Sequence, residues 1–224
     1  MLGMILLMSN SLWAQDKVDV KETGLYRHNQ MKYVFAMKYH DWRMAASALY
    51  DLIAMDPADD SVKLNLGYLY YQNNSFPSAL FISTDLLSRM PQNEKALELN
   101  AVCYENMGLK DKAISAYESL YLINNDLNVL FNTTALQYET GRKTEALTNA
   151  KIISENPKSK EIKLTYPKGE NETQEISLDA ASINLMGMIE KDNGNKEQAK
   201  EYFNKALSIA PDFELAKNQL KELE

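Results

Sequence analysis

The stretch that decides the fold is Ala180–Pro211, AASINLMGMIEKDNGNKEQAKEYFNKALSIAP, because its small residues stand at helix–turn–helix spacing. Gly187 falls in the first expected helix and Ala199 in the second, where two helices must approach closely. Gly194 lies between the two helices and tolerates a positive φ. The stretch therefore predicts two short antiparallel helices.

The order of residues in this stretch resembles the tetratricopeptide repeat, a helix–turn–helix unit of about 34 residues. The residues that carry the resemblance are Gly187, Gly194, Ala199, Phe203, Ala206 and Pro211. Asn195 and Gln198, three residues apart, predict a capping box at the start of the second helix. The resemblance implies a right-handed α-solenoid that acts as a binding scaffold, of the kind found in exported bacterial proteins of this family.

The same offsets recur upstream. Pro57 and Pro91 lie 34 residues apart, and Ala45 and Ala79 precede them by the same twelve residues as in the stretch quoted first. The expected repeats are residues 26–59, 60–93, 94–127, 128–157 and 180–213, and the fourth is the least regular. We expect an all-α solenoid of about five helix pairs, closed by a capping helix over residues 212–224.

Composition limits the classes of partner. The chain has 224 residues, 25% of them charged, and a net charge of −7, so no basic surface for nucleic acid is indicated. No internal run of apolar residues is long enough to cross a membrane. We expect a protein or peptide partner, no nucleic acid and no membrane span in the mature chain, while the oligomeric state is left open.

The N-terminal segment Met1–Gln15 is apolar and carries no side-chain charge, which is typical of the central region of a signal peptide. Ala14 is the expected residue before the cut, and residues 16–25 would form a leader. This interpretation predicts a periplasmic or otherwise exported protein. The alternative is a hydrophobic helix that packs on the first repeat.

Between the fourth and fifth repeats, over residues 158–178, the apolar period changes from that of a helix to that of a strand. A turn-rich segment that begins at Pro167 separates two short alternating runs. The alternating apolar residues are Ile162, Leu164, Tyr166, Ile176 and Leu178. We expect an inserted β-hairpin whose apolar face lies on the solenoid, because an isolated hairpin is marginal in water. A disordered loop is the alternative.

Motifs for catalysis are missing from the sequence. It has no glycine-rich phosphate loop, no Cys-x-x-Cys pair, no His-Glu-x-x-His and no nucleophile elbow. The lone Cys103 is expected to be a small buried hydrophobe, and His28 and His40 to be surface residues. The sequence therefore predicts a protein that is not an enzyme, with no cofactor and no metal site.

The candidate ligand groove follows from the first-helix residues that packing does not use. The resemblance places these positions on the concave face of the array. The apolar members are Val34, Met37, Tyr68, Tyr71, Val102, Leu136 and Met188. The asparagines expected to bond a ligand backbone are Asn65, Asn132 and Asn184, and Asn100 recurs at a similar place.

Together these features predict a non-catalytic scaffold in the cell envelope that binds a peptide or protein segment in the concave groove. The alternative is a chaperone-like or accessory subunit of an envelope enzyme or of a secretion or assembly complex. The two interpretations differ in the contact surface, which is the groove for the scaffold and the hairpin for the accessory subunit.

Overall fold

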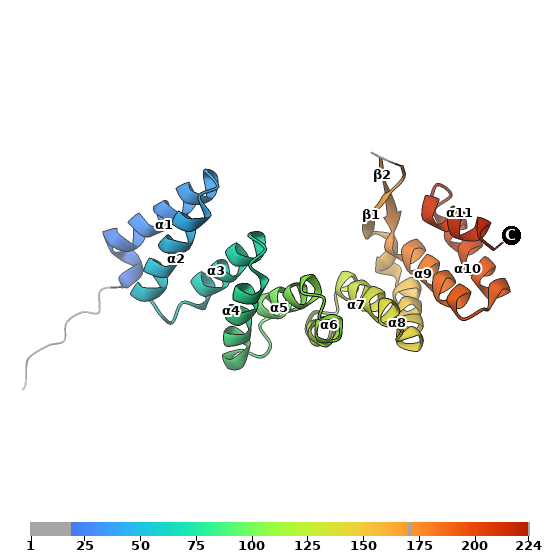
Figure 1. The fold of residues 1–224 in the computed structure, drawn as a ribbon, viewed down its shortest axis with the longest axis horizontal. Coiled ribbons are helices and arrows are strands. Elements are labelled where there is room, and N and C mark those ends of the chain that lie inside the picture. Colours follow the sequence, from blue (N-terminus) through green and yellow to red (C-terminus); the bar gives the residue numbers. More distant parts are fainter. Residues whose placement is uncertain (1–18, 170–171, 224) are drawn as a thin grey trace, which may run out of the picture. The chain divides into compact units, whose positions relative to one another are not determined.

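The computed structural model describes residues 19–169 and 172–223. Helices make up most of this part of the chain, with one small sheet formed by residues 163–167 and 173–177 (Figure 1). The described residues divide into two compact parts, residues 19–63 and the residues from 64 onward. We call them the N-terminal part and the C-terminal part and describe each by itself.

The N-terminal part holds one helix pair. Its elements are η1 (Val20–Glu22), α1 (Gly24–Lys38), α2 (Trp42–Met55) and the beginning of α3 (Asp60–Gln72). Thr23 caps α1 by accepting a hydrogen bond from the backbone N–H of Tyr26, and Asp41 caps α2 in the same way. Ala45 and Leu49 of α2 are buried, which lets the two helices pack closely.

The C-terminal part holds the remaining helices. Its helices are the rest of α3, α4 (Phe76–Arg89), α5 (Glu94–Asn106), α6 (Lys110–Asn124), α7 (Leu127–Glu139), α8 (Lys143–Glu155), α9 (Leu178–Asp192), α10 (Lys196–Ile209) and α11 (Glu214–Lys221). From α5 onward, each second helix packs on its own first helix and also on the helix that follows, as α6 does on α5 and α7. This stacking confirms the predicted all-α fold of helix pairs.

Each of the five described helix pairs turns at a residue with positive φ. These residues are His40 (57°), Asn74 (57°), Gly108 (72°), Gly141 (79°) and Gly194 (84°). Gly194 was expected at this position. His and Asn enter the left-handed region more readily than most side chains, which explains how two of the turns form without glycine.

The predicted capping box at α10 is wrong. Asn195 stands at the N-cap, but its side chain accepts no hydrogen bond from the helix backbone. Its Nδ2 instead donates to Oε2 of Glu190 at 2.6 Å. Glu190 is buried in α9 and needs a donor, so it takes the amide that the capping box would have used.

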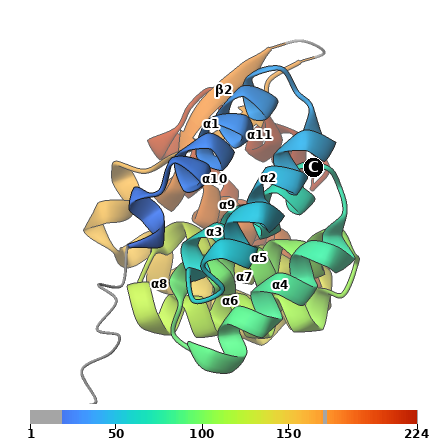
Figure 2. The same ribbon diagram turned by 90° about the vertical axis from the view of Figure 1, so that its left-hand side faces the viewer.

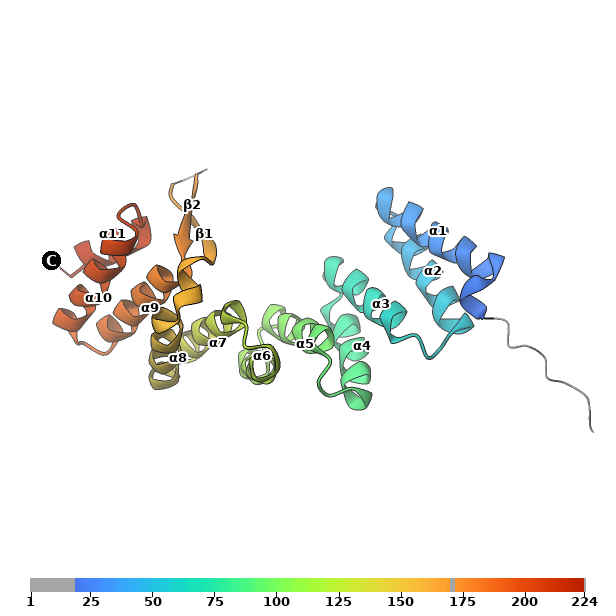
Figure 3. The ribbon, with the colours of Figure 1, turned by 180° about the vertical axis from the view of Figure 1, so that it is seen from behind.

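The inserted hairpin is confirmed. After η2 (Pro157–Lys160), β1 (Lys163–Pro167) pairs antiparallel with β2 (Thr173–Ser177), and Leu164 stands opposite Ile176. The hairpin lies beside α9 and α11 (Figures 2 and 3), where Leu164, Tyr166 and Ile176 join their apolar cluster. The predicted apolar face therefore does lie on the solenoid.

The last helix, α11, closes the C-terminal part. It is shorter than the expected residues 212–224, but Phe213 just before it and Ala216 within it are fully buried. Leu223 packs with Phe203 of α10. These contacts cover the apolar side of the last pair, as a terminal cap must.

Candidate functional site

The residues predicted to line the groove differ in burial. In the C-terminal part, Tyr68, Val102 and Met188 are half-buried. Leu136 is only 4% exposed and packs in the cluster that includes Ala101. Leu136 is therefore a core residue and not a surface contact.

Two predicted members of the stripe, Val34 and Met37, lie on α1 in the N-terminal part. Val34 is exposed and Met37 is half-buried. Both side chains can therefore reach a ligand.

The asparagines do not share one environment. Asn65 and Asn132 are exposed, whereas Asn184 is 2% exposed and donates to Sδ of Met188 at 3.6 Å. Asn100 is also buried and donates to Ser83 Oγ at 3.1 Å. Asn184 and Asn100 are thus packing residues, because each lies one position away from the register of the exposed pair.

Tyr68 bridges two neighbouring helices. Its ring packs against the cluster of α3, α4 and α5, and its hydroxyl donates to the carbonyl oxygen of Lys95 at 3.4 Å. Burial, and next the charge of Glu98, raise the pKa of Tyr68. Tyr71 packs on Phe76 with ring centroids 5.7 Å apart. Tyr68 therefore presents a neutral, oriented ring at the surface of the first helices.

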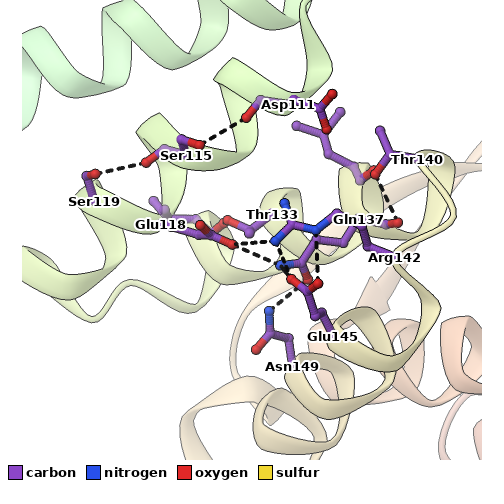
Figure 4. Close-up of polar contacts among 12 residues, drawn as sticks. Asp111, Ser115, Glu118, Ser119, Thr133, Gln137, Thr140, Arg142, Glu145 and Asn149 are labelled. Carbon is purple, nitrogen blue, oxygen red and sulfur yellow. Dashed lines mark hydrogen bonds and ion pairs between the residues drawn. The ribbon is translucent and has the colours of Figure 1, made fainter.

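A groove that the sequence did not predict lies between α6, α7 and α8 (Figure 4). Its volume is about 460 Å³. Its lining residues are Glu118, Tyr121, Leu122, Leu130, Thr133, Gln137, Thr144, Glu145, Thr148 and Asn149. Two of the three helices are second helices of their pairs, so most of this groove is formed away from the first-helix face.

A buried amide organises the polar side of this groove. Gln137 is 2% exposed, and its Nε2 donates to Glu118 Oε1 at 3.1 Å and to Glu145 Oε2 at 3.4 Å. Its Oε1 accepts from Asn149 Nδ2 at 2.9 Å (Figure 4). Arg142 donates to Glu145 and lies 3.6 Å from Glu118. Two carboxylates thus share one guanidinium and one amide.

The arrangement suits a cationic side chain next to an apolar one. The two carboxylates outnumber the single guanidinium, and both remain partly exposed. Leu122 is 81% exposed on the groove wall. The sequence signal for this site was weak, because the position of Gln137, four residues before its turn, carries Tyr104 and Glu190 in the neighbouring repeats and so follows no common pattern.

Reactive groups are not gathered at any of these surfaces. No group of three metal-ligating side chains occurs in the described ranges 19–169 and 172–223. Burial raises the pKa of the Cys103 thiol to about 11, which suppresses its thiolate. Among the described residues, no helix is long and apolar enough to cross a bilayer.

Comparison with known proteins agrees with this architecture. Residues 180–213 match the family model for the tetratricopeptide repeat. The chain has the tetratricopeptide-repeat fold. No curated protein matches it in sequence.

Solved structures with the tetratricopeptide-repeat fold cover most of the chain. A tetratricopeptide repeat protein from Parabacteroides merdae is 20% identical, with a TM-score of 0.69, over 90% of this chain and 73% of that one. YrrB, described as a TPR protein with an unusual peptide-binding site, is 15% identical, with a TM-score of 0.66, over 89% and 98%. MamA is 16% identical, with a TM-score of 0.65, over 83% and 91%.

Proposed function

We propose that the protein is a non-catalytic interaction scaffold that binds a peptide or protein segment. The repeat fold supports this proposal, since stacked helix pairs create extended surfaces for binding. The similarity to YrrB supports it further, because that protein is described as having a peptide-binding site.

The proposed site is the first-helix face of the C-terminal part, and the observation that carries it is the placement of Tyr68. The ring is half-buried between α3 and α5 and is already oriented by its hydroxyl contact. A pre-oriented aromatic side chain loses little entropy on binding, which favours an anchor role. The other accessible members of this proposed site are Asn65, Tyr71, Val102, Asn132 and Met188. Val34 and Met37 lie on α1 in the N-terminal part and are not counted in this site.

Substitution of Tyr68 tests this site. Peptides selected from a random display library on the immobilised full chain would be measured against wild type and Tyr68→Ala by fluorescence anisotropy. Loss of an aromatic anchor weakens binding by on the order of 2 kcal/mol. Tyr202→Ala, a half-buried tyrosine on the second helix α10, is the matched control. Equal affinities for wild type and Tyr68→Ala would place the site elsewhere.

A second candidate site is the groove of α6, α7 and α8. Its exposed Leu122 and its two carboxylates favour a segment with a basic side chain beside an apolar one. If this groove is the site, Glu118→Gln should lower the affinity of the protein for the selected peptides and should reduce the salt dependence of that affinity. If only Tyr68→Ala weakens binding, the first-helix face is the peptide site.

We also propose that the protein works in the cell envelope, because Met1–Gln15 has the pattern of a signal peptide. This segment lies outside the described residues. Mass spectrometry of the native protein should find an N-terminus near Gln15, and an intact Met1 would contradict export. In the alternative role, as an accessory subunit, the outward residues of the hairpin such as Thr165 and Glu175 would make the contact.

A further inference from the structure

The helix α1 exposes several large apolar side chains on one side. Met31 is 51% exposed and Phe35 is 49% exposed, and Leu25 and Tyr39 are more exposed still. Together with Met44 at the start of α2, most of them line a groove of about 490 Å³. The lining residues are His28, Met31, Lys32, Phe35, Ala36, Tyr39, Asp41 and Met44, all in the N-terminal part, and we call this surface the α1 docking face.

All later first helices bury the position that Phe35 leaves open. Phe35 stands five residues before its turn residue, as do Cys103 and Ile189, which are fully buried. Met31 stands nine residues before its turn, where Leu99 and Leu185 are buried but Asn65 and Asn132 are exposed. The covered side of a later first helix is therefore marked most clearly by the position of Phe35.

In the C-terminal part, a helix of the preceding pair covers this side of a later first helix. The second helix of the preceding pair packs there, as α4 does on α5 and α8 does on α9. The α1 docking face therefore has the chemistry of a surface on which a helix stacks.

The helices α1 and α2 differ in net charge from the whole chain, although Asp41 and Lys32 balance each other in the lining of the face itself. The segment 24–55 contains four basic residues and two acidic ones, a net charge of +2, whereas the chain has −7. The basic residues are Arg27, Lys32, Lys38 and Arg43. Lys32 is held by Asp51 at 3.0 Å. A second copy of the chain placed face to face would bring like charges together, which is unfavourable.

We infer that the α1 docking face binds an acidic amphipathic helix of a partner protein, stacked as the second helix of a preceding pair would be. The apolar side of that helix covers Met31 and Phe35, and its carboxylates face Lys38, whose Nζ lies 5.7 Å from the ring centroid of the lining residue Tyr39. This surface is independent of the site proposed around Tyr68. Loss of either site leaves the other intact.

Synthetic helical peptides test the inference on the full-length protein. The probe carries Leu and Phe at helix spacing with Glu at the remaining positions, and its partner peptide has Lys in place of every Glu. The acidic peptide should bind, as measured by fluorescence anisotropy, and the basic peptide should not. Phe35→Ala should weaken binding by about tenfold or more, while Tyr68→Ala has no effect.

The matched control is Phe81→Ala, which removes a phenyl ring that is 77% exposed on α4. It should leave the affinity unchanged, and both variants should keep the wild-type melting temperature because neither ring is buried. Equal binding of the two peptides, or unchanged affinity in Phe35→Ala, would overturn the inference. So would a dimer in sedimentation that Phe35→Ala abolishes, since a second copy would then cover the face.

Discussion

The ring of Phe203 lies against the backbone of Gly187, so that a Cβ on this glycine would stand 2.5 Å from the ring carbon Cε1. Phe203 is fully buried and cannot retreat. Close approach of α9 and α10 therefore requires glycine at this position.

Gly187→Ala should destabilise the C-terminal part by about 1–3 kcal/mol, because the added methyl group overpacks the contact. Urea unfolding followed by circular dichroism measures the loss. Gly24→Ala is the control, since its Cβ would meet no atom within 4 Å. The explanation fails if the two substitutions change stability equally.

The hairpin should contribute to stability through one ring contact. Tyr166 and Phe213 have ring centroids 5.0 Å apart, and Phe213 is fully buried. Tyr166→Ala should cost about 2–3 kcal/mol in thermal or urea unfolding. Thr165→Ala changes the neighbouring residue, whose side chain is exposed, and should lower the free energy of unfolding far less. An unchanged melting temperature in Tyr166→Ala would make the hairpin a passive insertion.

Gln137 should tolerate an apolar replacement better than a charged one. Gln137→Glu buries a third carboxylate beside Glu118 and Glu145, which should destabilise the protein by about 3 kcal/mol or more at neutral pH. The loss should shrink as the pH falls towards 5 and the new carboxyl takes up a proton. Gln137→Leu should lose less stability, about 1–3 kcal/mol, without that pH dependence.

Urea unfolding at pH 7 and pH 5 separates the two variants of Gln137. Thr144→Glu adds the same charge at an exposed position of the groove and serves as the control. A loss in Gln137→Glu that does not depend on pH would argue against a buried charge as its cause.

Low pH should lower the stability of the N-terminal part, because the carboxylate of Asp59 then takes up a proton. Burial alone would raise the pKa of its carboxyl, but hydrogen bonds from Lys21 and Ser61 hold it at about 2, below the usual 3.8. A carboxyl whose pKa is lowered by folding stabilises the fold at every pH above the pKa that it has in the unfolded chain. The contribution of Asp59 is therefore present above about pH 4 and is lost as the pH falls towards 2.

Asp59→Asn should therefore flatten the acid dependence of stability between about pH 4 and pH 2. Trp42 fluorescence in a Trp13→Phe background reports unfolding of the N-terminal part during acid titration. An identical acid transition in wild type and Asp59→Asn would show that the Lys21 contact adds nothing in solution.

Features set by spacing along the chain could be predicted from the sequence. The five pairs, the hairpin and the turn at Gly194 follow from local pattern, because side-chain period and backbone freedom are local properties. Burial of Leu136 and Asn184 could not be read in this way, since it depends on how neighbouring helices pack. The polar groove around Gln137 was missed for the same reason, as its partners come from three helices.

The surroundings of α9 set it apart from other helices in the array. Twelve of its fifteen residues are buried, and β2 runs into it with no residue between them. In α5 and in α7 only six of thirteen residues are buried, so a copy of either helix would bring polar side chains into this enclosed place. Removal of the hairpin would in turn bare the side of α9 that holds Ala180, Ala181 and Ile183, so the last helix pair and the hairpin form one packed unit.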